Sequence, residues 1–472
     1  MLYHSVKVPS KKWLAQLRKT ISIREGAILL DTPESYTHQD HKHYSFFAFE
    51  PEKLLKVQQG KFQTLGFELE QKLDAFDGLR YLFDLYPKPS QTNQLPFEGG
   101  LMGYLGYHLE NERKQSYLKN DLKLPELWMG YYTVALVYSR DEQQLHIVGI
   151  ENQQLKADQL LLFIKNSSKS ALEDFTLCSD WQNNMSQSQY IEKFNQVKKY
   201  LQNGDCYQIN LAQRWNAQYQ GDPWTVYQML CELNSAPYSA FVNISPDQQV
   251  LSLSPEQFVQ CQPDPVNHHK IHCQTKPIKG TTARSTDLKV DQQSILDLAH
   301  SAKDQSENVM IVDLLRNDFS KVCEPHSVEV TQLFEVETYP AVHHLVSTVE
   351  GLLEEPFDAI DLLQACFPGG SITGAPKIRS MEIIDELEPN GRSVYCGTIG
   401  YISANGSMDT NIAIRTLVTE AQQIYCWAGG GLVIDSLPLN EYQETLDKVS
   451  AILPAISLHG TQSVDGLESD SV

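Results

Sequence analysis

The chain has 472 residues, of which 41% are hydrophobic, so it can bury a large core and is not a globally disordered protein. Its 38 basic residues against 59 acidic residues give a formal charge of −21, which argues against nucleic acid or an anionic membrane surface as the main partner. An anionic small molecule is compatible with this charge, because it needs only a local cationic patch or a metal ion.

The nine cysteines are scattered without C-x-x-C spacing, which favours buried thiols in a reducing compartment over a disulfide framework or a zinc site. Lys7, Lys11 and Lys12 are not followed by an apolar segment, so no signal peptide is predicted. The longest apolar stretch, around Tyr131–Tyr138, is too short to cross a bilayer. These features predict a cytoplasmic protein.

Short apolar alternations predict strands in the first part of the chain, and one stretch with helical spacing predicts a helix that stops before Pro87. The expected strands lie within Ile21–Val57, Gly99–Tyr107, Met129–Ser139 and Leu145–Ile150, and the expected helix spans Gln71–Tyr86.

A stretch rich in Ser, Asn and Gln, residues 166–188, predicts a connection between an N-terminal part, residues 1–165, and a second part, residues 189–457. The acidic, Ser- and Gly-rich tail, residues 458–472, is predicted to be disordered.

The second part alternates helical and strand patterns without an internal repeat, which predicts one large mixed α/β domain. Its expected helices are Ser188–Gln202, Asp287–Asp318 with a break near Ser301–Asp304, and Leu439–Ile456. Its expected strands are Cys206–Arg214, Val250–Leu253, Ile271–Lys276, Gly397–Ser403, Asp409–Thr419 and Gln423–Ala428, and Gln262–Lys270 is expected to be a surface hairpin loop.

Lys279 follows the predicted strand Ile271–Lys276 closely. Pro277 is disfavoured in a central strand, and Gly280 permits a tight bend, so the side chain of Lys279 is expected at the mouth of a strand. A lysine there is compatible with a nucleophile, an electrostatic clamp or an ordinary surface cation.

The C-terminal helix places Glu441, Glu444 and Lys448 on one face. A solvated charged face is the usual explanation of such a pattern. The preceding Gly429–Gly431 changes that balance, because successive glycine amides can bind a carboxylate, and the two glutamates can bind Mg²⁺.

Four further residues are ambiguous from the sequence. Glu307 follows Lys303 by four residues, which by itself predicts an exposed ion pair. Arg415 is predicted on a central strand, where its partner is a ligand carboxylate or an internal acid. His344 has the pattern of a satisfied core histidine or of a catalytic one, and Glu256 can act as an acid near pH 7 only if burial or a nearby negative charge raises its pKa.

Nine segments occur in order between residues 185 and 455: Gly204–Arg214, Leu253–Glu256, Pro277–Thr281, Glu307–Asp318, His343–Ser347, Gly370–Lys377, Tyr395–Arg415, Gly429–Gly431 and Glu441–Lys448. Together they resemble the chorismate-utilising enzymes, which include anthranilate, aminodeoxychorismate, isochorismate and salicylate synthases. This resemblance implies an α/β (α+β) fold with a large two-layered antiparallel β-sandwich, surrounding helices and a deep cleft for Mg²⁺-bound chorismate.

The resemblance also implies roles for individual residues. By position, Glu307 and Glu444 are similar to the family's Mg²⁺ ligands, and Glu441 lies close by and acts through water. The ring carboxylate of chorismate then bridges the metal and the amides of Gly429, Gly430 and Gly431. The enolpyruvyl carboxylate binds Arg415 and Tyr395. The other residues implied to line the site are Gly280, Thr281, His344 and Lys448.

Two positions distinguish the reactions of the family. Enzymes that add water at C2 carry a lysine base where this chain has Gln208, so isochorismate and salicylate synthesis are disfavoured. Anthranilate synthases usually carry alanine where this chain has Lys279, whereas a lysine is similar to the aminodeoxychorismate synthases, in which it is the proposed covalent nucleophile. Glu256 is then the acid that protonates the leaving C4 hydroxyl.

The expected reaction consumes ammonia, and none of the cysteines sits in a G-x-C-x-G elbow, so the resemblance implies a separate glutaminase partner in a heterodimer. The alternative enzyme is an anthranilate synthase component I. A more remote alternative, a catalytically inactive tryptophan-binding subunit, comes from a resemblance of Leu29–Thr32 and of Pro237, Tyr238 and Ser239 to the family's tryptophan pocket. Asp31 and Thr32 depart from the residues usual in that pocket.

Overall fold

The structure is a computed structural model of the chain, and it describes residues 1–32, 44–70, 73–89, 95–109, 121–166, 172–264, 267 and 270–458. The predicted disordered tail, apart from residue 458, lies outside the described residues, as does part of the predicted loop Gln262–Lys270. Within the described residues, no helix combines the length and the apolar character needed to span a membrane.

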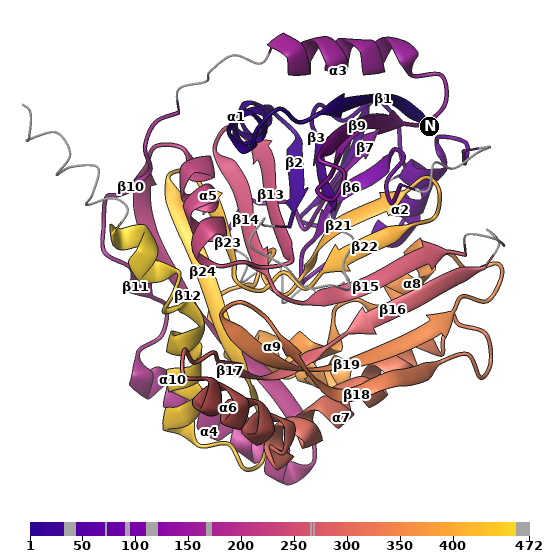
Figure 1. Cartoon of the computed structure of the whole chain (residues 1–472). Helices are drawn as coiled ribbons and strands as arrows, with labels where there is room; N and C mark the ends of the chain where they lie inside the picture. The colour runs from indigo at the N-terminus through magenta and orange to yellow at the C-terminus, as the bar shows by residue number, and fades with distance from the viewer. Residues whose placement is uncertain are drawn as a thin grey trace, which may run out of the picture.

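Two large antiparallel sheets form the centre of the molecule (Figure 1). In the described residues the first sheet has 13 strands, in the order β1 (Leu2–Lys7), β9 (Gln144–Gly149), β8 (Val134–Ser139), β3 (Tyr44–Ala48), β2 (Ala27–Asp31), β13 (Tyr238–Ser245), β14 (Gln248–Ser254), β23 (Thr416–Glu420), β24 (Gln423–Leu432), β12 (Gln208–Gln220) and β10 (Thr176–Leu177), with β11 (Gln182–Asn183) and β20 (Gly374–Ala375) also paired to β12.

The second sheet has 11 strands in the described residues, in the order β17 (Ile278–Ala283), β19 (Val342–Leu352), β16 (Ile271–Lys276), β15 (Gln257–Pro263), β22 (Met408–Asn411), β21 (Thr398–Ser403), β6 (Gly100–Leu105), β7 (Leu127–Tyr132), β4 (Lys53–Gln58) and β5 (Lys61–Leu65), with β18 (Glu329–Thr338) paired to β19. The expectation of a two-layered antiparallel α/β fold is therefore confirmed.

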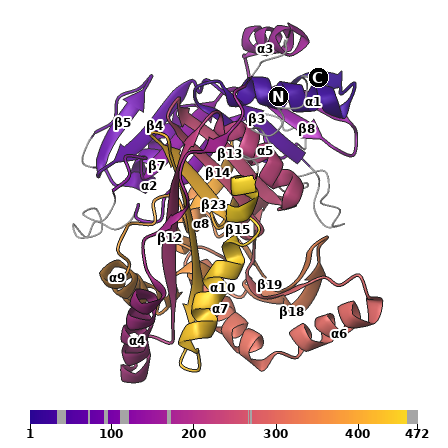
Figure 2. The ribbon, with the colours of Figure 1, turned by 90° about the vertical axis from the view of Figure 1, so that its left-hand side faces the viewer.

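Helices surround the two sheets (Figures 1 and 2). They are α1 (Lys11–Ser22), α2 (Ala75–Asp84), α3 (Gln154–Asn166), α4 (Gln187–Asn203), α5 (Pro223–Leu233), α6 (Leu288–Ala299), α7 (Ala302–Phe319), α8 (Ala359–Cys366), α9 (Lys377–Leu387) and α10 (Pro438–Val449), with a 3-10 turn, η2, at Gly370–Ile372. The polar connection predicted at residues 166–188 contains β10 and β11, and strands from both sides of it contribute to each sheet.

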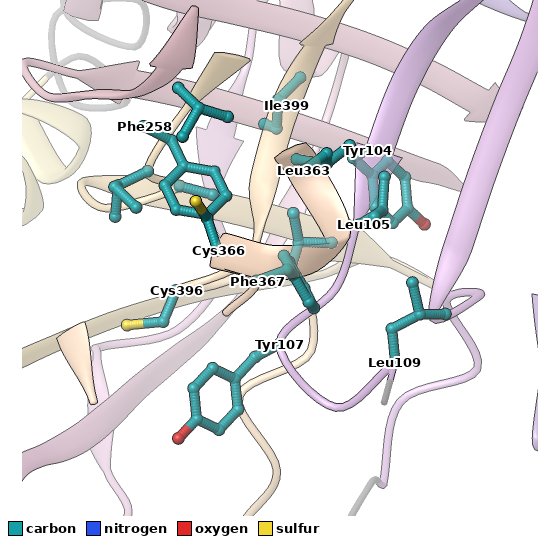
Figure 3. Close-up of a cluster of buried hydrophobic side chains, with 14 of the residues drawn as sticks. Tyr104, Leu105, Tyr107, Leu109, Phe258, Leu363, Cys366, Phe367, Cys396 and Ile399 are labelled. Atoms are coloured by element: carbon teal, nitrogen blue, oxygen red, sulfur yellow. The ribbon is translucent and has the colours of Figure 1, made fainter. Parts of the chain in front are cut away.

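The period-2 alternation of the strands divides the core in two. On β3, Phe46 faces the space between the sheets and contacts Tyr401, with ring centroids 4.8 Å apart, whereas Phe47 belongs to a second cluster with the apolar residues of α1, α3 and α5. The first cluster continues beneath α8, where Leu363, Cys366 and Phe367 gather with residues of the second sheet (Figure 3).

Local sequence signals predict the boundaries of several elements correctly. The predicted strand Ile271–Lys276 is β16, and α4 ends at Gly204, whose φ of 77° is readily adopted by glycine. The predicted break near Ser301–Asp304 is also present, because Ser301 is the N-cap of α7 and its side chain accepts a hydrogen bond from the backbone N–H of Asp304.

The single strand predicted over Asp409–Thr419 is wrong. β22 ends at Asn411 in the second sheet, and β23 begins at Thr416 in the first. The alternating pattern continues across this change of sheet, which a sequence period cannot reveal. Arg415 therefore lies at the crossing between the sheets with a φ of 49°, rather than on a central strand.

Candidate active site

β17 positions Lys279 through a bulge. Its pairing with β19 shifts register between Ile278 and Thr281, at Gly280, which has a φ of 83°. A Cβ at Gly280 would lie 2.9 Å from side-chain atoms of Asp304 and Leu298, so glycine is needed for β17 to pack against α6 and α7. The close approach that Gly280 permits is thus to these two helices, and its contact with substrate stays a prediction.

Lys279 and Glu256 lie close together in the candidate site, and both interact with Ser371. The ammonium nitrogen of Lys279 donates a hydrogen bond to the carbonyl oxygen of Ser371, 3.1 Å away. Burial lowers the pKa of Lys279, although the carboxylates of Glu307 and Glu256 oppose the shift. Glu256 is 5% exposed, and burial raises its pKa despite a hydrogen bond from Ser371 and the nearby charge of Lys279. Both shifts favour the neutral forms, an amine and a carboxylic acid.

α10 packs against β24 (Figure 1), and the carboxylates of Glu441 and Glu444 lie beside Gly430 of that strand; Figure 2 shows α10 from another side. The side chain of Glu441 is only 3% exposed, so the solvated face that its spacing usually predicts is wrong at this position. Glu444 is 42% exposed and pairs with Lys448 at 2.8 Å, and Lys448 also donates to the carbonyl oxygen of Gly429 at 2.7 Å. Burial alone would raise the pKa of Glu444, but Lys448 and Lys303 hold it below its ordinary value.

The three glycines are part of β24 rather than a loop beyond it. They pair with Asn210, Leu211 and Ala212 of β12, whereas the pairing of β24 with β23 reaches only Cys426. A Cβ at Gly430 would lie 3.3 Å from carboxylate oxygens of both Glu441 and Glu444, and a Cβ at Gly431 would lie 2.2 Å from the amide nitrogen of Gln208. The missing side chains therefore leave room for the carboxylates and for Gln208.

The carboxylate of Glu307 on α7 lies close to that of Glu441 on α10. The sequence spacing of Glu307 does not show which residues of other helices lie near it. Lys303 lies 3.8 Å from Glu307 and 3.5 Å from Glu441, measured from Nζ to the nearest Oε1 in each case. Glu307 is 12% exposed, and burial raises its pKa while Lys279 opposes the shift. The exposed ion pair expected from its spacing therefore involves a buried carboxylate.

The carboxylates fit a divalent cation chemically. Glu307 Oε1 and Glu441 Oε2 are buried and accept no hydrogen bond from the described residues, and Gly430 leaves the space before them open. Carboxylate oxygens are the ligands that Mg²⁺ prefers. Among the described residues, no group of three or more His, Cys, Asp or Glu side chains already has metal-site spacing. The ammonium of Lys303 lies between two of these acids instead.

Arg415 lies at the crossing between the sheets, and His344 lies on β19. Arg415 is half-buried, and no acid among the described residues forms an ion pair with it. The Nδ1 atom of His344 lies 2.8 Å from the hydroxyl of Thr281, and burial together with the charge of Arg415 lowers the pKa of His344 to about 3. His344 is therefore neutral, and Arg415 is available for an anionic ligand.

Tyr395 is buried, and its ring stacks on Trp427 with centroids 6.1 Å apart. Burial raises the pKa of Tyr395, so its hydroxyl stays protonated and can donate a hydrogen bond. Its contact with a substrate carboxylate stays a prediction.

The residues that resemble a tryptophan pocket lie elsewhere. Asp31, Thr32, Pro237, Tyr238 and Ser239 line a cavity of about 1660 Å³ between the two sheets. The hydroxyl of Thr32 donates to the carbonyl oxygen of Pro237 at 2.9 Å. Binding of an amino acid there stays a prediction.

The family described as chorismate binding enzyme matches residues 32–454. The chain belongs to this family. It is 49% identical to aminodeoxychorismate synthase component 1 of Escherichia coli K12, over 78% of this chain and 79% of the relative. It is 43% identical to the protein of the same name from Klebsiella aerogenes, over 92% and 94% of the two chains.

A solved structure, anthranilate synthase component I of Streptococcus pneumoniae TIGR4, matches the fold of this chorismate-binding enzyme. The two superpose with a TM-score of 0.75 at 29% identity, over 88% of this chain and 93% of that one. The fold is thus common to family members whose names state different activities, and the activity has to be argued from the site.

Two features of the site are absent from the sequence prediction. Ser371 joins Lys279 and Glu256, and Lys303 reaches Glu441 as well as Glu307. Ser371 lies within one of the segments that resemble the family, which is a usable signal. The second contact of Lys303 depends on how α7 and α10 pack, and no local pattern encodes it.

Proposed function

We propose that this chorismate-binding enzyme aminates chorismate at C4 to give 4-amino-4-deoxychorismate, the aminodeoxychorismate synthase reaction of 4-aminobenzoate formation. The observation that carries the proposal is a half-buried lysine, Lys279, beside a buried acid, Glu256: both interact with Ser371, and both have pKa values shifted toward their neutral forms. The relatives named aminodeoxychorismate synthase component 1 support the same activity.

The neutral amine of Lys279 attacks C2 of chorismate and forms a C–N bond. The two ring double bonds shift, the C4–O bond breaks, and Glu256 supplies the proton that converts the leaving hydroxide into water. Ammonia then attacks C4, the double bonds return to their original positions, and the C–N bond to Lys279 breaks. The sum is chorismate plus ammonia giving 4-amino-4-deoxychorismate plus water, with the enolpyruvyl group retained.

Glu307 and Glu444 would hold Mg²⁺, with Glu441 adjacent. When bound, the metal neutralises and orients the ring carboxylate of the substrate. Arg415, which has no acidic partner among the described residues, binds the enolpyruvyl carboxylate. Burial of Lys279 and Glu256 keeps water away from the reacting carbons.

Ammonia comes from a separate glutaminase subunit, which hydrolyses glutamine and delivers the product to this chain. The words "component 1" in the relatives' names fit a protein that acts with a second component. The location that fits these roles is the cytoplasm. Ammonium salts alone should support turnover by the purified chain, because the amination chemistry resides here.

The product decides the function. Chorismate, MgCl₂ and ammonium chloride are incubated with the purified chain, with and without an added aminodeoxychorismate lyase. We expect 4-aminobenzoate only when the lyase is present. Fluorescent anthranilate with release of pyruvate would contradict the proposal and identify an anthranilate synthase, and intact chorismate would contradict both activities.

A further inference from the structure

Lys303 on α7 contacts two acids, one on α7 and one on α10; Figure 1 labels both helices. It lies one turn before Glu307 on α7, and its ammonium nitrogen is 3.8 Å from Glu307 Oε1 and 3.5 Å from Glu441 Oε1 on α10. The lysine side chain is 56% exposed, whereas both acids are largely buried. One exposed cation therefore lies between two largely buried anions.

Ammonium and carboxylate groups share the site. Lys303 interacts with Glu441, Glu307 and Glu444, and Lys448 interacts with Glu444. Mg²⁺ alone would add two positive charges beside these ammonium groups. Mg²⁺ together with a substrate that carries two carboxylates would add no net charge, so the second arrangement is electrostatically favoured.

Lys303 is the lysine that can leave most easily. Lys448 is bound at hydrogen-bond distance to both Glu444 and the carbonyl oxygen of Gly429, and Lys279 is half-buried and donates to Ser371. The contacts of Lys303 are longer, and more than half of its side chain is exposed. Rotation of this side chain would uncover Glu307 Oε1, which accepts no hydrogen bond from the described residues.

We propose that Lys303 is a displaceable counter-ion: it occupies the space between Glu307 and Glu441 in the empty enzyme and moves into solvent when Mg²⁺ and the substrate bind. This inference rests on the proposed function, because it takes these acids as the metal site. Mg²⁺ by itself then binds weakly, because it has to displace the ammonium group of Lys303. It binds more tightly when the carboxylates of the substrate add negative charge to the site. Metal and substrate therefore bind cooperatively, and an idle site does not retain Mg²⁺.

The test is a calorimetric titration of Mg²⁺ into the purified chain without substrate, at low ionic strength where exposed charges are least screened. The Lys303→Met variant keeps an unbranched side chain, one heavy atom shorter, and removes its charge. We expect it to bind Mg²⁺ roughly three- to tenfold more tightly than the wild type, as expected for the loss of one partly exposed competing cation.

Two control variants test whether the change in Mg²⁺ affinity depends on the charge at position 303. Lys303→Arg retains a cation and should bind Mg²⁺ with the affinity of the wild type within about twofold. Arg316→Met removes another cation from α7, one that pairs at 3.0 Å with the exposed Asp313, and it should leave Mg²⁺ affinity unchanged.

A thermal melt gives an independent measurement. In EDTA, the Lys303→Met variant should melt at a lower temperature than the wild type, because Glu307 and Glu441 have lost their shared counter-ion, and added Mg²⁺ should stabilise it more than it stabilises the wild type. Equal or weaker Mg²⁺ binding by Lys303→Met would overturn the inference. The product assay with the wild type tests the proposed function separately, and wild-type protein that binds no Mg²⁺ even with chorismate present would overturn both.

Discussion

The charged site and the inter-sheet cavity are two polar regions of one fold, and they treat their acids differently. In the cavity, Asp31 accepts a hydrogen bond from Ser45 at 2.6 Å and pairs with Arg18 at 3.0 Å. At the charged site, Glu307 and Glu441 each have a buried oxygen with no hydrogen-bond donor among the described residues. One region satisfies its charges internally, and the other leaves them available.

Buried charge without a partner is costly, so a fold retains it where a ligand supplies the partner. The same contrast extends to the cations. Arg18 pairs with Asp31, whereas Arg415 is half-buried and pairs with no acid in the described part of the chain. The cavity offers a large volume, and the acids that accept no internal hydrogen bond favour the region around Lys279 as the place where a charged ligand binds.

The largest expected difference between the two regions is the effect of substituting Lys279. Lys279→Ala removes the proposed nucleophile, so chorismate consumption with ammonium should fall by about 10³-fold or more. The assay is the loss of chorismate absorbance under saturating ammonium chloride.

A matched control lies three residues away, where Lys276 pairs with Glu337 at 2.7 Å. Lys276→Ala breaks a largely buried ion pair and should lower the melting temperature while the chemistry continues. Equal losses of turnover in the two variants, with both still folded, would mean that Lys279 has only a structural role.

Glu256→Gln should lower kcat by about 10²- to 10⁴-fold, the usual contribution of general acid catalysis. The pH profile sharpens this result. The productive form has neutral Lys279 and protonated Glu256, so the wild-type rate should fall at low pH, where the amine is protonated, and at high pH, where the acid is ionised.

In Glu256→Gln the acid no longer titrates, so the decline at high pH should disappear and the remaining rate should rise with pH until Lys279 is neutral. A variant that keeps the full bell-shaped profile of kcat/KM against pH would exclude Glu256 as the acid.

Glu444→Gln should weaken Mg²⁺ binding by about 10- to 100-fold, because a carboxylate ligand is replaced by a neutral amide. Calorimetry in the presence of chorismate measures the effect. Glu386→Gln is a suitable control. Glu386 lies on α9 and is not one of the three acids, and its carboxylate accepts a hydrogen bond from the hydroxyl of Tyr200 at 2.9 Å. Unchanged Mg²⁺ affinity in Glu444→Gln would remove Glu444 from the metal site.

The smallest effect is expected in the cavity. Thr32→Val removes the hydrogen bond to the carbonyl oxygen of Pro237 and should lower the free energy of unfolding by about 1 kcal/mol. Turnover should be unchanged, which separates this region from the catalytic one. A large loss of kcat in a folded Thr32→Val protein would contradict that separation.

Much of the local structure follows from the sequence because its signals are local. The cap at Ser301, the helix end at Gly204 and the strand Ile271–Lys276 depend only on neighbouring residues, and the structure contains all three. The sequence also predicts which acid and amine side chains belong to the site, because ordered segments resemble a family with known chemistry, and their roles stay predictions.

Features that depend on packing could not be predicted. The proximity of Glu307 and Glu441 results from the docking of α7 and α10, and sequence spacing says nothing about it. Arg415 was expected on a continuous strand, because the alternation of apolar residues does not register a change of sheet. The contact of Lys279 with Ser371 likewise joins two segments that only the tertiary fold brings together.

The most direct test of covalent catalysis is peptide mass spectrometry of enzyme quenched in acid after mixing with chorismate and MgCl₂ in the absence of ammonia. The peptide that contains Lys279 should gain the mass of chorismate less one water, and the adduct should disappear when ammonium is added before the quench. Unmodified Lys279 under conditions in which the same preparation turns over with ammonium would contradict a covalent role for this amine.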